Sequence, residues 1–152
     1  DYNQFLHEII PDKMASITNG PILDEKNNVL GEHKGFTKYT IGQRKGIGLS
    51  FPEPRYVKKI NPVDNSITVS KKESLYSKKC TAYNINFFSD SLKFPIKLDA
   101  KIRYNSKSSL ATIDKVKNEL EINFDTPQLA ITSGQSIVFY KEDLLVGGAI
   151  IK

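Results

Sequence analysis

The residue types best suited to ligand binding gather in one glycine-rich stretch, residues 31–49. It holds five glycines, which lie on both sides of the consecutive side chains Gln43, Arg44 and Lys45. Glycine permits positive φ and close backbone approach. Arginine offers a planar fork to a phosphate, lysine a point charge, and glutamine both a donor and an acceptor. The pattern predicts a loop that holds a polyanion. A tight connection between strands with solvated charges fits it equally well.

Charge is concentrated around the same stretch. The chain of 152 residues has a net charge of +5, which permits nucleic-acid binding without requiring it. The segment from Lys34 to Lys59 contains seven basic residues and only one acidic residue, Glu53. The basic residues are Lys34, Lys38, Arg44, Lys45, Arg55, Lys58 and Lys59. Phe36 and Tyr39, which lie between them, are of a type that stacks on bases. With these glycines and aromatic residues in the run, a nucleic-acid partner and a merely solvated basic face fit the sequence about equally well.

Catalytic signatures are absent from the sequence. It contains no phosphate loop, C-x-x-C pair or H-E-x-x-H motif, and no apolar run long enough to span a bilayer. His7 and His33 are not at metal-ligand spacing, and we interpret His7 as a surface residue of a helix. The single cysteine, Cys80, suits a reducing compartment. The adjacent Lys79 would lower the pKa of its thiol. Because no His or Asp is tied to Cys80 by spacing, we favour a structural thiol over a nucleophile.

The hydrophobic pattern predicts a mainly β protein in two domains. Helical spacing of apolar residues predicts a short helix over residues 2–10, ended by Pro11. Two hairpins follow, pairing residues 22–23 with 29–30 and residues 56–60 with 66–70. Six further strands are expected at 81–88, 96–104, 109–115, 119–124, 136–140 and 146–151. We expect a small central α+β domain over residues 1–70. A small antiparallel β-barrel or sandwich of six strands should follow over residues 71–152, with the polar segment 71–74 as the junction.

Several motifs carry a resemblance to a known family. The run Gly31-x-His33-x-Gly35, followed by Tyr39-Thr-Ile-Gly-Gln-Arg-Lys-Gly-Ile-Gly48, resembles the signature of the tRNA-specific 2-thiouridylases. Residues 101–104, 130–140 and 146–151 resemble later segments of that family in the same order. The chain departs from the family at Ser133, where a proline is usual, at Ala149, where a glycine is usual, and in lacking a tryptophan. The resemblance covers essentially the whole chain.

The resemblance implies a division of labour between domains. In that family an N-terminal domain binds ATP and Mg²⁺, carries two catalytic cysteines, adenylates the wobble uridine of tRNA and inserts sulfur from a persulfide. This chain resembles only the central domain and the C-terminal barrel, a barrel like those of elongation factors. We therefore expect no catalytic residue, metal site or cofactor in this chain, and Cys80 matches neither catalytic cysteine. The expected partners are tRNA and a sulfur-carrier protein. We also expect the protein to be cytoplasmic and monomeric.

The resemblance also assigns residues to RNA binding. Arg103 and Tyr104, on the expected strand 96–104, match family positions that touch tRNA, as does Gln135. Arg103 would fork onto a phosphate, Tyr104 would stack or donate a hydrogen bond, and Gln135 would contact a sugar hydroxyl or a base edge. Gln43, Arg44 and Lys45 are the next candidates. Tyr104 as a barrel-core aromatic remains open. Two other functions also remain open: a barrel that docks a sulfur carrier, and an enzyme that uses Cys80.

Overall fold

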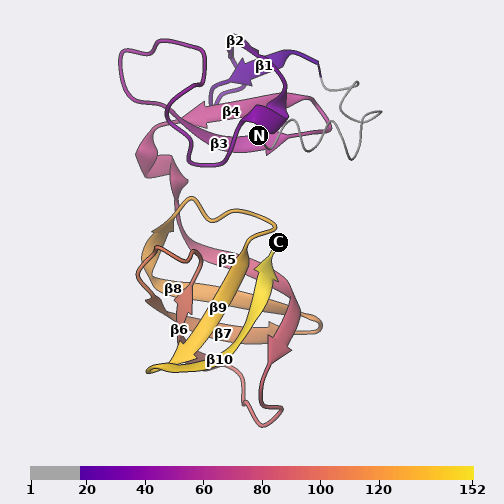
Figure 1. Cartoon of the computed structure of the whole chain (residues 1–152), viewed down its shortest axis with the longest axis vertical. Coiled ribbons are helices and arrows are strands. Elements are labelled where there is room, and N and C mark those ends of the chain that lie inside the picture. Colours follow the sequence, from indigo (N-terminus) through magenta and orange to yellow (C-terminus); the bar gives the residue numbers. More distant parts are fainter. Residues whose placement is uncertain (1–17) are drawn as a thin grey trace. The chain divides into compact units, whose positions relative to one another are not determined.

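The computed structural model describes residues 18–152, which fall into two compact units (Figure 1). The first unit runs to Leu75 and the second covers Tyr76–Lys152. The helix expected over residues 2–10 lies outside the described residues. In the part that the structure describes, no helix is long and apolar enough to cross a membrane.

The first unit is built on a four-stranded sheet in the order β2-β1-β4-β3. Its strands are β1 (Gly20–Leu23), β2 (Val29–His33), β3 (Tyr56–Asn61) and β4 (Ser66–Ser70). Both predicted hairpins form as antiparallel pairs, and β1 joins them by running parallel to β4. The Asp24 carboxylate shapes the first hairpin turn by accepting the backbone N–H groups of Lys26 and Asn28 at 2.8 and 2.9 Å. Local turn chemistry therefore explains why the sequence marked this hairpin.

The core of the first unit includes a residue from the glycine-rich stretch. Five buried side chains form this core: Ile22, Ile47, Val57, Ile67 and Val69. Four of them come from strands, while Ile47 comes from the connection between β2 and β3. The aliphatic side chain of Ile47 thus ties the connection to the sheet. Burying each such side chain contributes about 1.5–3 kcal/mol to the free energy of folding.

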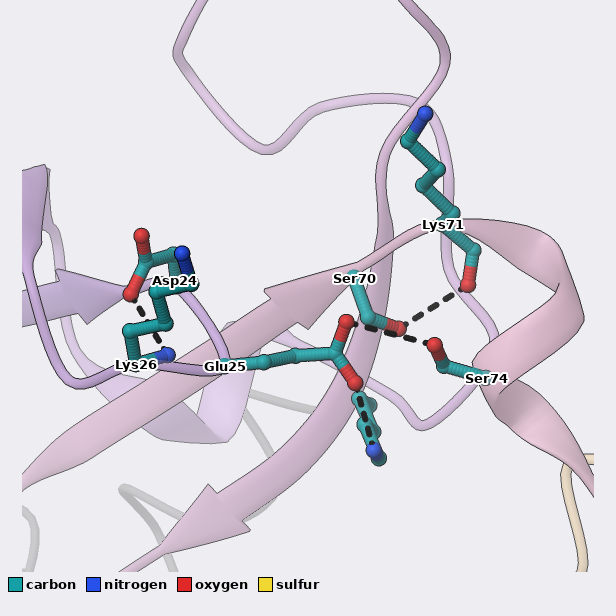
Figure 2. A network of polar contacts seen from close by, with 7 residues as sticks. Asp24, Glu25, Lys26, Ser70, Lys71 and Ser74 are labelled. Atoms are coloured by element: carbon teal, nitrogen blue, oxygen red, sulfur yellow. Dashed lines mark hydrogen bonds and ion pairs between the residues drawn. The ribbon is translucent and has the colours of Figure 1, made fainter.

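The polar segment that we expected as a junction belongs to the first unit. It forms η2 (Lys72–Leu75), a 3-10 helix that contacts β3. Figure 2 shows Glu25, from the β1–β2 turn, reaching toward Ser74. The Glu25 carboxylate accepts hydrogen bonds from Lys58 Nζ at 2.7 Å and from Ser74 Oγ at 3.2 Å. The bond from Lys58 is the main reason why the pKa of Glu25 lies below its ordinary value.

The second unit is the predicted six-stranded antiparallel barrel, closed in the order β10-β5-β8-β7-β6-β9. Its strands are β5 (Tyr76–Phe87), β6 (Ile96–Lys101), β7 (Ser109–Val116), β8 (Glu119–Leu129), β9 (Ser136–Lys141) and β10 (Leu144–Ile151). Alternate residues point inward, as in Leu98 and Ala100 of β6 or Ile137 and Phe139 of β9. Phe139 is fully buried, with its ring centroid 5.6 Å from that of Phe87. The barrel encloses its own hydrophobic core.

Candidate nucleic-acid interface

Gln43 is built into the loop that was predicted to hold a polyanion. Its side-chain Oε1 accepts the N–H of Thr40 at 3.0 Å, and its Nε2 donates to the carbonyl oxygen of Lys45 at 2.9 Å. The backbone of Gln43 also pairs with Val57, whose N–H it accepts at 2.9 Å. Because both ends of the amide are engaged, Gln43 shapes the loop and presents its neighbours.

Arg44 and Lys45 lie at the exposed tip of this loop. The flanking glycines have the left-handed backbone that the tip requires, with φ of +86° at Gly42 and +74° at Gly46. Within the described residues neither cation forms an ion pair, in contrast to Lys58 and its partner Glu25. The loop therefore offers two unpaired positive charges side by side.

The aromatic residues near this loop face inward. Phe36 and Tyr39 pack against the core of the first unit. The rings of Tyr39 and His33 meet edge to face, with their centroids 5.8 Å apart. Both rings are thus partly buried by this packing.

His33 is a structural residue that sequence reasoning passed over. It is fully buried, and its Nδ1 accepts the backbone N–H of Gly35 at 3.1 Å. Nε2 therefore carries the ring proton and donates to the carbonyl oxygen of Asn65, 3.0 Å away. The ring links the β2 end to the β3–β4 turn. The only local sign of this role in the sequence is that Gly31 and Gly35 lie two residues to either side of His33. Nothing in the sequence indicates that Asn65, 32 residues away, is its partner.

The barrel places Arg103 and Tyr104 in a turn, which corrects their predicted position on a strand. β6 ends at Lys101, and the backbone N–H and hydroxyl of Ser106 both bond to the carbonyl oxygen of Arg103, at 3.1 and 2.8 Å. The turn marked by residues 105–106 therefore begins closer to the N-terminus than the alternation of residues 100–104 suggested.

Tyr104 is a surface residue. Its side chain is 92% exposed, so the alternative of a barrel-core aromatic is wrong. Lys101 Nζ lies 5.7 Å from the centroid of its ring, a cation–π distance. A solvated aromatic face beside a cation is a suitable surface for stacking.

Arg103 points its guanidinium at the connection between β8 and β9. Its two terminal nitrogens donate to the carbonyl oxygens of Leu129, at 3.2 Å, and Ala130. This connection ends at Gln135, the other barrel residue that the sequence singled out. The structure thus brings Arg103 together with the segment that carries Gln135.

Gln135 has an unusual environment for a polar side chain. Its Oε1 is buried and has no hydrogen-bond partner within the described residues. Its backbone is held by β10, because its carbonyl oxygen accepts the N–H of Ile151 at 2.8 Å. An acceptor left unpaired in this way costs about 1–3 kcal/mol unless an ordered water satisfies it.

Comparison with known proteins matches both units. Residues 3–71 match the family described as the tRNA methyl transferase PRC-barrel domain, and residues 77–151 the aminomethyltransferase beta-barrel domain. The tRNA-specific 2-thiouridylases MnmA of Clostridioides difficile and Acetivibrio thermocellus are each 44% identical to this chain, over 99% and 100% of its length. The homologous protein of Clostridium perfringens is 43% identical over 100%.

The chain belongs to the tRNA-specific 2-thiouridylase family. It spans 42% of the length of the relatives that it matches, and it corresponds to their C-terminal portion. Within residues 18–152 no cluster of three or more His, Cys, Asp or Glu residues could hold a metal ion.

Cys80 lies in β5 and packs against the barrel core. Burial raises the pKa of its thiol from 9.0 to about 11, so the predicted lowering by Lys79 is wrong. The side chain lines a cavity of about 520 Å³, together with Glu121, Ile131 and Lys152. The thiol is therefore protonated at neutral pH, which is the opposite of what a nucleophile needs.

Alkylation should report this protonation. We expect Cys80 to react with iodoacetamide at neutral pH about 100-fold more slowly than a solvated cysteine, because its thiolate fraction is smaller by that factor. The rate should rise with pH up to about 11. Mass spectrometry of the alkylated chain between pH 7 and 11 measures it. A rate that levels off below pH 8 would restore Cys80 as a reactive thiol.

Proposed function

We propose that this chain is the tRNA-binding portion of a tRNA-uridine 2-sulfurtransferase, which makes 2-thiouridine at the wobble position. The observation that carries the proposal is its match, along its whole length, to proteins named tRNA-specific 2-thiouridylases. ATP-dependent activation with Mg²⁺, and persulfide sulfur transfer from a carrier protein, belong in this proposal to the N-terminal domain of the family. The proposed site of action is the cytoplasm.

Two groups of residues serve the proposed RNA contacts. In the first unit, Arg44 and Lys45 present unpaired charges to phosphates. At the barrel, Arg103, Tyr104 and Gln135 form the second group. Tyr104 offers an exposed ring to a base. Gln135 is half-buried and its Oε1 is covered, so in this proposal its amide nitrogen donates to a sugar hydroxyl or a base edge.

The salt dependence of binding tests the first group. We expect the double variant Arg44→Ala with Lys45→Ala to bind a tRNA with a wobble uridine more weakly. The slope of log affinity against log salt should fall by about 1.4–1.8, because each lost phosphate contact removes about 0.7–0.9. Fluorescence titrations between about 50 and 200 mM salt measure both quantities.

A matched control removes two cations that are already paired. Lys58 and Lys71 of the same unit form ion pairs with Glu25 and Glu53 at 2.7 and 2.6 Å. Their double alanine variant should keep a slope close to that of the unmodified chain. Equal slopes for the two double variants would contradict a phosphate-binding loop. If the unmodified chain shows no saturable binding at low salt, the tRNA proposal fails and a barrel that docks a sulfur carrier becomes the better hypothesis.

A further inference from the structure

We propose that Arg103 acts on RNA as a positioning residue, which braces the β8–β9 connection and so sets Gln135 in place. This inference rests on the proposed tRNA-binding function. It assigns Arg103 a role different from the phosphate fork that its residue type suggests.

The geometry of Arg103 commits its guanidinium to the protein. The residue is half-buried, and its two terminal nitrogens donate to consecutive carbonyl oxygens, those of Leu129 and Ala130. The planar fork of arginine, which could grip a phosphate with the same two nitrogens, is used here on the backbone. The hydroxyl and the N–H of Ser106 both donate to the carbonyl oxygen of Arg103. The backbone that carries the guanidinium is therefore held in a hydrogen-bonded turn.

The connection needs such a brace because its backbone is strained. Ala130 has φ of +50°, a left-handed conformation that residues other than glycine rarely adopt. Its carbonyl oxygen accepts a second hydrogen bond, from Thr132 Oγ1 at 2.9 Å. Arg103 and Thr132 thus converge on the strained residue and hold it.

The braced connection leads directly to Gln135. The N–H of Gln135 bonds to Thr132 O at 3.3 Å, and the N–H of Gly134 bonds to Ile151 O at 2.8 Å. The segment is therefore fixed to β10 at its end and to Arg103 at its start. Loss of the Arg103 contacts frees the start, and the Gln135 amide loses its defined place.

Hydrogen exchange tests the brace without RNA. In the full chain, Arg103→Ala should accelerate amide exchange at Gly134 and Gln135 by about tenfold, while exchange in β6 and β7 stays unchanged. Arg103→Lys, which keeps a donor able to reach a carbonyl oxygen, should restore part of the protection. Lys107→Ala removes an exposed cation that directly follows the turn and should leave exchange unchanged. Unchanged exchange in Arg103→Ala would overturn the inference.

tRNA titration then separates positioning from charge. We expect Arg103→Ala to lower the affinity for a wobble-uridine tRNA about tenfold with the salt slope unchanged. A direct phosphate contact would instead lower the slope by about 0.7–0.9. If Arg103 acts through Gln135, the double variant Arg103→Ala with Gln135→Ala should bind within twofold of Gln135→Ala alone. The inference would be overturned if the affinity losses of the two single variants multiply in the double variant, or if Arg103→Ala reduces the salt slope. Failure of the unmodified chain to bind tRNA, with exchange still accelerated, would overturn the proposed function alone.

Discussion

Replacement of His33 by phenylalanine is expected to lower the free energy of unfolding of the first unit by about 2–6 kcal/mol. The phenylalanine ring has no nitrogen, so it leaves the buried N–H of Gly35 and the carbonyl oxygen of Asn65 without their partner. Each such unsatisfied group costs about 1–3 kcal/mol. Amide exchange of β1 and β4 in increasing denaturant measures the loss, since the chain has no tryptophan to report it.

Two conservative variants separate the two hydrogen bonds. Asparagine at position 33 can place an acceptor near Nδ1 and spare Gly35, whereas glutamine can place a donor near Nε2 and spare Asn65. Each should recover about half of the loss. A phenylalanine variant as stable as the unmodified chain would show that the two backbone groups find other partners.

The surroundings of His33 leave little room for such other partners. A Cβ added at Gly20 would lie 1.9 Å from the carbonyl oxygen of Asn65 and 2.8 Å from His33 Nε2. The backbone of β1 therefore presses directly on the hydrogen bond between His33 and Asn65. Because interiors are close-packed, the pair cannot shift to repair a lost contact.

Alternation along the chain was enough to predict six strands in a barrel or a sandwich, and the family resemblance favoured the barrel, but neither predicted where the strands end. The alternation of residues 100–104 is a local pattern, and it predicted a strand over residues 96–104, of which the structure forms Ile96–Lys101 as β6. The end of β6 is set by contacts that sequence neighbours do not reveal. Arg103 turns away to bond with carbonyl oxygens at residues 129 and 130, and this leaves Tyr104 in solvent.

The candidate site was predictable in residue type and less so in role. Glycines around Arg44 and Lys45 indicated an exposed loop, and the structure places both cations at its tip. Gln43 has the same composition signal, yet its amide closes the loop. A sequence shows which side chains are polar, while their partners depend on which segments the fold brings together.

Phe139→Ala is expected to destabilise the barrel by about 3–5 kcal/mol. The side chain is fully buried in the core, against Phe87, and its removal costs the transfer free energy plus that of a cavity. Thermal unfolding followed by far-UV circular dichroism, with amide exchange of β6 and β9, measures the loss. Phe139→Leu leaves a smaller cavity and should cost less than half as much. Equal losses for the two variants would mean that the core does not relax around leucine.

This variant also shows how far tRNA binding depends on the barrel. If Tyr104 and Gln135 bind tRNA only on a folded barrel, tRNA at 100 times its Kd should return about 2.7 kcal/mol of stability to the Phe139→Ala chain. Partial refolding of the variant by a wobble-uridine tRNA, read from protection of β9 amides, is therefore the expected result. Restored protection with an unrelated polyanion such as heparin would point to charge alone. No restoration by either would place tRNA binding outside the barrel, and Arg44 and Lys45 would then carry it.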